Sequence, residues 1–387
     1  MKSEAMKILY YEDKESGHKH YKDDTIEDHY DHADNVSGNN KDIENHYENH
    51  FENDDSAILN IPNLNQSHHE SAPNSMKNAS SNRAASKSKF SHMNLKEQIM
   101  NETDFKRKPL MILFSSWVFS KEKMLVHAVL RRNWKSWASI KPAVLTRDHI
   151  VRNDCRRQGW MVRGLSDVDR ACYGPPVLSS MFTDLFKNND AYFYGYSNAD
   201  IVYGDGLEET LKFIFYHFSP WKTKPILIVG RRYNVNFVKY KNESWRTPAD
   251  IARMAKYGQL VIRSTDYFFT NKHFPWGKAP GVSIGRPYVV RAIIAWALRS
   301  GFHVIDATRT IESVHMTTQD GVYASWHTKG VTCNQRILAA LKWSIPTYIG
   351  HCECARMETF RDEEGSIQIR RRPPSKKICS RTYKNSK

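Results

Sequence analysis

The chain has 387 residues, of which 57 are Lys or Arg and 42 are Asp or Glu, and its formal net charge is +15. It has no apolar run of about 18 residues, so we expect no membrane span within these residues. The six cysteines are too few for a fold built on disulfides, and the only close pair, Cys352 and Cys354, does not have a usual zinc spacing.

The charge divides the chain into an acidic and a basic part. Residues 1–105 contain 11 basic and 20 acidic side chains, and the remainder contains 46 and 22, so the two parts carry −9 and +24. The first part is rich in Asn, Asp, His and Ser, and it cannot bury enough apolar surface to offset its conformational entropy. We predict a disordered acidic tail over 1–105. Its histidines do not repeat at a fixed spacing, which favours a solvated tail over a metal-chelating tract.

From residue 109 onward, apolar segments of strand length alternate with segments of helical periodicity. Strands are expected at 110–119, 143–146, 160–164, 226–230, 266–270 and 303–307, and a strand together with the turn after it at 191–203. Helices are expected at 121–138, 150–159, 175–189, 207–218, 248–258 and 288–300. Strands that are apolar on both faces are typical of a mostly parallel sheet covered by helices. The sequence therefore predicts one α/β domain over 106–360, a three-layer α/β/α sandwich. A frayed basic tail is expected over 361–387.

Polar and charged side chains follow several of these strands. In open parallel sheets, ligands bind beyond the carboxyl ends of the strands. A carboxylate and an imidazole there are suitable ligands for Mn²⁺ or Mg²⁺, and arginines suit a diphosphate. Each residue also has a structural explanation, such as a helix cap, a solvent-facing arginine or a core histidine. Their shared position favours a binding site. The candidates are Asn198, Asp200, Arg231, Arg232, Arg286, Asp306, Thr308 and His315.

The motifs GYSNADIVYGDGLEETL, ILIVGRR, STDYFFTNKHFPW, SIGRP, HVIDAT and SVH occur in this order. In this combination the chain resembles, from about 109 to 340, a glycosyltransferase-like family of the nucleotide-diphospho-sugar transferase (GT-A) superfamily. The resemblance implies a GT-A-like domain that moves a sugar from a nucleotide-diphosphate sugar to a glycan or other acceptor hydroxyl. It also implies a divalent metal, Mn²⁺ or Mg²⁺, as cofactor.

The resemblance also implies roles for single residues. Asn198-Ala199-Asp200 stands at the superfamily's DxD motif, so Asp200 inherits a metal-ligand role and Asn198 a donor-binding one. His315 stands at a second metal-ligand position. Asp266 matches an acidic position near the acceptor, which makes it the candidate general base. The three candidate arginines, Arg231, Arg232 and Arg286, would hold the diphosphate.

One departure from the family pattern leaves functions other than sugar transfer open. Relatives often continue GRP with an aromatic–Asp–Asn stretch, whereas here Val290 and Arg291 stand at the Asp and Asn positions. The chain could then be a catalytically degenerate protein that binds nucleotide sugars. Its basic, aromatic-rich body also suits a polyanion such as a nucleic acid or sulfated glycan. No nucleic-acid-binding motif occurs, so nucleic acid is not the expected partner.

The expected location depends on whether the sequence includes the whole protein. Transferases of this kind usually work in the Golgi lumen behind an N-terminal membrane helix. We therefore expect the Golgi lumen if an N-terminal anchor is missing from this sequence, and the cytoplasm otherwise.

Overall fold

The computed structural model describes residues 107–165, 168–172, 174–218, 224–262, 264–318, 330–341, 350–373 and 379. The tail predicted over 1–105 lies outside these residues, so its disorder stays a prediction. Most of the chain after residue 373 also lies outside them.

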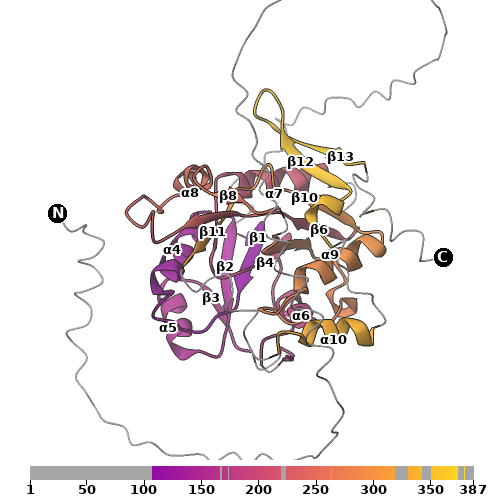
Figure 1. Cartoon of the computed structure of the whole chain (residues 1–387), viewed down its shortest axis with the longest axis horizontal. Coiled ribbons are helices and arrows are strands. Elements are labelled where there is room, and N and C mark those ends of the chain that lie inside the picture. Colours follow the sequence, from indigo (N-terminus) through magenta and orange to yellow (C-terminus); the bar gives the residue numbers. More distant parts are fainter. Residues whose placement is uncertain are drawn as a thin grey trace, which may run out of the picture. The chain divides into compact units, whose positions relative to one another are not determined.

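A nine-stranded sheet forms the centre of the described part, in the order β13-β12-β10-β6-β9-β4-β1-β2-β3 (Figure 1). Five neighbouring pairs are parallel and three are antiparallel, which confirms the mostly parallel sheet. The strands are β1 (Met111–Ser115), β2 (Ile140–Leu145), β3 (Met161–Arg163), β4 (Phe193–Ser197), β6 (Ile226–Val229), β9 (Tyr267–Asn271), β10 (His303–Asp306), β12 (Met357–Arg361) and β13 (Ile367–Arg371).

Helices cover both faces of this sheet, so the predicted three-layer sandwich is confirmed. Met111 and Leu113 of β1 pack into one apolar cluster and Ile112 and Phe114 into another, because successive side chains of a strand point to opposite faces. In Figure 1 the helices of the first cluster lie to the left and top, and those of the second to the lower right. The first set is α4 (Met124–Trp134), α5 (His149–Arg157), α7 (Gly206–His217) and α8 (Pro248–Ala255); the second is α6 (Leu178–Asn188), α9 (Val289–Arg299) and α10 (Cys333–Ala340).

A second, four-stranded sheet has the order β5-β11-β7-β8. Its strands are β5 (Ile201–Tyr203), β7 (Tyr233–Asn236), β8 (Gln259–Leu260) and β11 (Ser313–Thr317). The strand and following turn predicted over 191–203 are observed as β4 and a turn at residues 198–200, and the chain then continues as β5 in the second sheet, a strand that was not predicted. This turn carries two of the candidate site residues.

The prediction of a frayed C-terminal tail from residue 361 onward is wrong for the first part of that segment. β12 and β13 form an antiparallel hairpin at the edge of the main sheet. Two of the basic residues that suggested a solvated tail, Arg370 and Arg372, pair with buried acidic residues. Arg372 Nη2 lies 2.9 Å from Asp306 Oδ2 and 2.5 Å from Glu358 Oε2. Burial of paired charges is tolerated, so the basic composition did not exclude a strand.

Two disulfides join distant segments, Cys172 to Cys333 and Cys354 to Cys379, while Cys155 and Cys352 are free and buried. The close pair Cys352 and Cys354 thus has one bridged and one free member, and Cys352 Sγ lies 2.9 Å from Thr265 Oγ1. None of the described helices is both long and apolar enough to cross a bilayer.

Candidate functional site

One edge of the main sheet collects most of the predicted site residues. β1, β4, β6 and β10 are mutually parallel, so their carboxyl ends, Ser115, Ser197, Val229 and Asp306, lie at this edge. β9 runs antiparallel to β4 and β6, so it is the start of β9 that reaches the same edge. The residue before this strand, Asp266, therefore lies at that edge.

Asp200 and His315 lie side by side, although 115 residues separate them. β5 and β11 pair antiparallel with His315 opposite Ile201, and Met316 N donates to Asp200 O at 3.0 Å. This register brings Asp200 Oδ2 within 3.2 Å of His315 Nε2. Only 5 % of the His315 side chain and 19 % of the Asp200 side chain are exposed. Asp200 Oδ1 and His315 Nδ1 are buried and have no hydrogen-bond partner among the described residues.

The surroundings of Asp200 favour its charged form. Burial by itself would raise the pKa of this carboxyl, but His315, Lys123 and Arg232 together hold it well below its usual value. A carboxylate with an unpaired oxygen next to an imidazole suits a hard divalent cation. Two neighbouring ligand atoms that lie at right angles, each about 2.1 Å from an ion, are about 3 Å apart. The distance between Asp200 Oδ2 and His315 Nε2 is close to this value.

The pair alone is not a complete metal site. In the described ranges, no cluster of three or more His, Cys, Asp or Glu side chains could hold a metal ion. Further ligands would have to come from a bound molecule or from water. Ions such as Mg²⁺ are often held in this way, by one or two carboxylates together with substrate phosphates.

Asp266 is part of a polar chain that leads toward this pair. Its Oδ1 lies 2.5 Å from Arg232 Nη1 and accepts a hydrogen bond of 2.9 Å from Asn198 Nδ2. Arg232 Nε donates to Asn234 Oδ1 at 2.8 Å, and Asn234 lies opposite His315 in the pairing of β7 with β11. Asp266 Oδ2 is buried and has no hydrogen-bond partner in the described part of the chain. The structure thus joins three of the predicted residues, Asn198, Arg232 and Asp266.

The neighbouring arginine, Arg231, points to a different partner. Its Nη2 lies 3.3 Å from Glu353 Oε1, and its backbone N–H donates to Thr308 Oγ1 at 2.9 Å. The preceding Gly230 has a packing reason, since an added Cβ would lie 1.8 Å from the Tyr267 hydroxyl. Sequence reasoning missed Glu353, which lies between two cysteines in a short segment without periodicity.

Arg286 approaches the same edge from the other face of the sheet. α9 leads into β10, so its N-terminus and the preceding loop lie at the carboxyl edge. Arg286 Nη2 donates to Cys172 O at 3.3 Å and Nη1 to Gly285 O at 2.8 Å. These contacts are with the segment before α6 and with its own loop.

A buried asparagine that sequence reasoning missed holds this loop. Asn334 is fully buried; its Nδ2 donates to Ser283 O and Pro287 O at 2.9 and 3.0 Å, and its Oδ1 accepts from Ser283 N at 2.8 Å. Only the amphipathic pattern of α10 could have placed this residue in the interior. Asn334 therefore fixes the backbone from which Arg286 projects.

The departure from the family pattern lies in the first turn of α9. Val290 is half-buried there, and the Arg291 guanidinium lies 5.8 Å from the centre of the Tyr288 ring. Tyr288 has a φ of 69°, in the left-handed region that non-glycine residues rarely adopt. Such conformations cluster at functional sites, which marks this loop as part of the candidate site.

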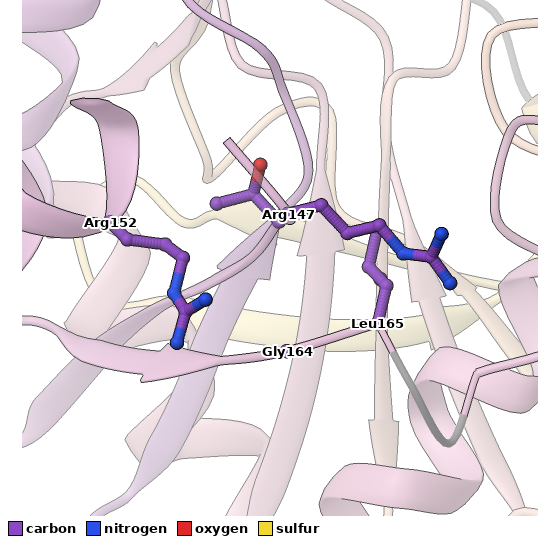
Figure 2. Close-up of a pocket in the computed structure, with 5 residues that line it drawn as sticks. Arg147, Arg152, Gly164 and Leu165 are labelled. Atoms are coloured by element: carbon purple, nitrogen blue, oxygen red, sulfur yellow. The ribbon is translucent and has the colours of Figure 1, made fainter. Parts of the chain in front are cut away.

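A cavity of about 350 Å³ opens beyond β2 and β3 and is lined by Thr146, Arg147, Arg152, Gly164 and Leu165 (Figure 2). Figure 2 shows Arg152 approaching from the left, from α5, and Arg147 extending to the right. Both arginines were absent from the predicted set, although Arg147 directly follows the end of a predicted strand. Two guanidinium groups at a strand edge are suited to an anionic ligand.

His127 of α4 lies near Asp200 and makes folding stability sensitive to acid. Burial and the nearby Arg131 lower the pKa of His127 to about 4, from an ordinary value of 6.5. Between pH 6.5 and 4 the unfolded chain binds a proton that the folded chain does not. We therefore expect the free energy of unfolding to be flat above this window and to fall by about 2 kcal/mol by pH 5.

Thermal or denaturant unfolding at a series of pH values measures this dependence. His127→Gln should reduce the fall between pH 7.5 and pH 5, whereas His149→Gln at an exposed position should keep it. An equally steep fall in His127→Gln would show that other groups cause the acid sensitivity.

Comparison with known structures gives distant similarities. Mannosyl-3-phosphoglycerate synthase from Rubrobacter xylanophilus is 11% identical, with 70% of this chain and 90% of that chain covered and a TM-score of 0.36. Glucosyl-3-phosphoglycerate synthase from Mycobacterium tuberculosis in complex with phosphoglyceric acid is 12% identical, with 70% and 92% covered and a TM-score of 0.34.

A third similar structure is S. aureus TarS in complex with UDP-GlcNAc, 14% identical with a TM-score of 0.23. The match covers 33% of this chain and 35% of that one, so it spans about a third of the TarS structure. The sequence matches no protein-family model and no curated protein.

Proposed function

We propose that this chain is a glycosyltransferase that moves a sugar from a nucleotide-diphosphate sugar to an acceptor hydroxyl with the help of a divalent metal, Mn²⁺ or Mg²⁺. The observation that carries the proposal is the pair of Asp200 and His315 at the carboxyl edge of the sheet. Asp200 Oδ2 and His315 Nε2 are 3.2 Å apart. The other carboxylate oxygen of Asp200, Oδ1, is buried and has no hydrogen-bond partner among the described residues.

The cavity at β2 and β3 lies along the same edge of the sheet as Asp200. Adjacent strands are about 4.8 Å apart, so the end of β2 lies about 10 Å from the end of β4, with β1 between them.

Each candidate residue of the chain has a separate role in the proposed reaction. Asp200 and His315 would hold the ion, which when bound would offset the negative charge that develops on the leaving diphosphate. Arg231, Arg232 and Arg286 add positive charge along the edge, and Asn198 positions Asp266 by its hydrogen bond. Asp266, through its unpaired Oδ2, is our proposal for the group that accepts the proton of the acceptor hydroxyl.

A donor screen by thermal shift tests the proposal. The full chain is heated with UDP-, GDP- and CMP-sugars, each with Mn²⁺ or with a chelator. We expect one class of donor to raise the unfolding temperature when Mn²⁺ is present and to lose this effect with the chelator, because a ligand stabilises the state that it binds.

Two outcomes would contradict the proposal that the chain is a glycosyltransferase. One is that no nucleotide sugar shifts the transition while RNA or heparin binds tightly and dissociates with salt, which would favour the polyanion-binding alternative. The other is donor binding with no transfer to any acceptor and no release of free sugar, as expected of the degenerate protein with Val290.

We also propose an oxidising compartment as the place where the chain works, because disulfides form and persist in such compartments. The bridges Cys172–Cys333 and Cys354–Cys379 support the lumenal alternative over the cytoplasmic one. Free thiols at these four positions in protein isolated from its native cells would contradict it.

A further inference from the structure

Large apolar side chains gather on the surface beside the candidate site. Nine such side chains are exposed among the described residues, and more than half of them lie in two adjoining segments. Single exposed apolar residues are normal, but a contiguous group marks a contact surface. The group, called the apolar rim below, consists of Val118 (69 % exposed), Phe119 (36 %), Met124 (44 %), Leu125 (48 %) and Ile150 (38 %).

Hydrogen bonds hold the two segments of the apolar rim together. Phe119 N donates to Asp148 Oδ2 at 2.9 Å, and Thr146 Oγ1 donates to Trp117 O at 2.7 Å. Trp117 itself is buried, with its ring 5.3 Å from that of His127 and 5.9 Å from that of Trp160. The backbone is thus anchored from both sides, so the apolar side chains are presented outward by an ordered loop.

Basic side chains surround the apolar rim. Lys121 and Lys123 lie within the loop, and Arg147 and Arg152 lie beside Ile150; the acidic residues in the same two segments are Glu122 and Asp148. Both carboxylate oxygens of Asp148 already accept backbone hydrogen bonds, from Phe119 and Val151. Four cations against two anions leave a positive surface with apolar groups projecting from it.

We propose that the apolar rim binds the surface of an anionic phospholipid membrane. Apolar side chains flanked by Lys and Arg are the composition with which proteins lie in the interface, with the apolar groups about 5–10 Å deep and the cations at anionic headgroups. A second copy of this chain fits less well, because a symmetric contact brings the same four cations against one another.

The position of the apolar rim relates it to the candidate site. The loop after β1 and the start of α4 lie at the carboxyl edge of the sheet, and Lys123 is close enough to lower the pKa of Asp200. A membrane bound here would lie next to that edge. If the proposed function holds, the acceptor hydroxyl belongs to a molecule presented at the membrane surface, such as a glycolipid headgroup.

Sedimentation of the full chain with phosphatidylcholine vesicles, with and without phosphatidylserine, tests the proposal. No nucleotide is present, so the outcome is independent of the proposed transferase activity. We expect the chain to sediment with phosphatidylserine vesicles and to be released by salt. Phe119→Ser combined with Leu125→Ser should weaken this binding at least about tenfold, because two large apolar contacts are removed.

Val238→Ser is the matched control, since Val238 is 48 % exposed like Leu125 but lies outside the apolar rim. It should bind as the unaltered chain does, and all variants should share one circular dichroism spectrum. The proposal is overturned if the unaltered chain ignores anionic vesicles at low salt, or if the double variant binds them equally well. It is also overturned if light scattering shows a dimer that the double variant dissociates, because the apolar rim would then be a self-interface.

Discussion

Asp200→Asn is expected to abolish Mn²⁺-dependent binding of a nucleotide sugar. The substitution keeps the shape of the side chain but removes the charge that the surroundings hold ionised. Loss of residues that only orient a metal ligand lowers metal affinity about 10–100-fold, so loss of a ligand itself should weaken it at least about 100-fold. Isothermal titration of the donor, with Mn²⁺ and with a chelator, measures the change.

Asp205→Asn is the control for this substitution. Asp205 is exposed and lies five residues further along the same segment, at the start of α7. It should bind the donor and Mn²⁺ as the unaltered chain does. If Asp200→Asn also binds the donor unchanged, and the chelator has no effect on either protein, Asp200 and His315 are a structural ion pair and the metal is not part of the site.

Asp266→Asn is expected to stop sugar transfer while leaving donor binding within a few-fold. Amide and carboxylate have the same shape, so the contact with Asn198 keeps its geometry, but an amide cannot accept the proton of the acceptor. General base catalysis contributes about 10²–10⁴-fold, and the rate of transfer should fall by that factor. Steady-state kinetics with a saturating donor separate the loss of kcat from a change in binding.

The same substitution also leaves Arg232 without its ionic partner, and this effect needs its own control. Glu353→Gln provides it, because Glu353 pairs with the adjacent arginine, Arg231, at the same edge. If the loss in Asp266→Asn comes from proton transfer, Glu353→Gln should keep most of its activity. Equal losses in both variants would mean that the carboxylates only hold the two arginines in place. Unchanged transfer in Asp266→Asn would exclude Asp266 as the base.

Much of the central fold could be predicted because its signals are local. Side chains that alternate between two buried faces identify β1, β4 and β6, and the 3.6-residue period identifies α4 to α9, since each pattern is complete within a few turns or residues. The residues that end parallel strands follow from the same pattern. For this reason the sequence predicts that Asn198, Asp200 and the Gly230-Arg231-Arg232 turn lie at strand ends, without knowledge of the strand order.

The direction and partner of a strand are not local properties. β9 is as apolar as its parallel neighbours, and only its pairing with β4 and β6 shows that it runs the other way and brings Asp266 to the edge by its start. The second sheet likewise depends on β5 and β11 meeting in one register, which places His315 beside Asp200.

The sequence by itself therefore determined the alternation of elements, the layered class and which polar residues end the strands. The tertiary structure decided which of them meet: Arg232 with Asp266, Arg231 with Glu353, and Arg286 with the loop held by Asn334. It also placed residues 367–371 in β13 rather than in a tail, with Arg370 paired to Glu358 and the following residue, Arg372, paired to Asp306 and Glu358. Side-chain periodicity is set within one element, whereas pairing of charges and strands is set by the free energy of contacts between distant ones.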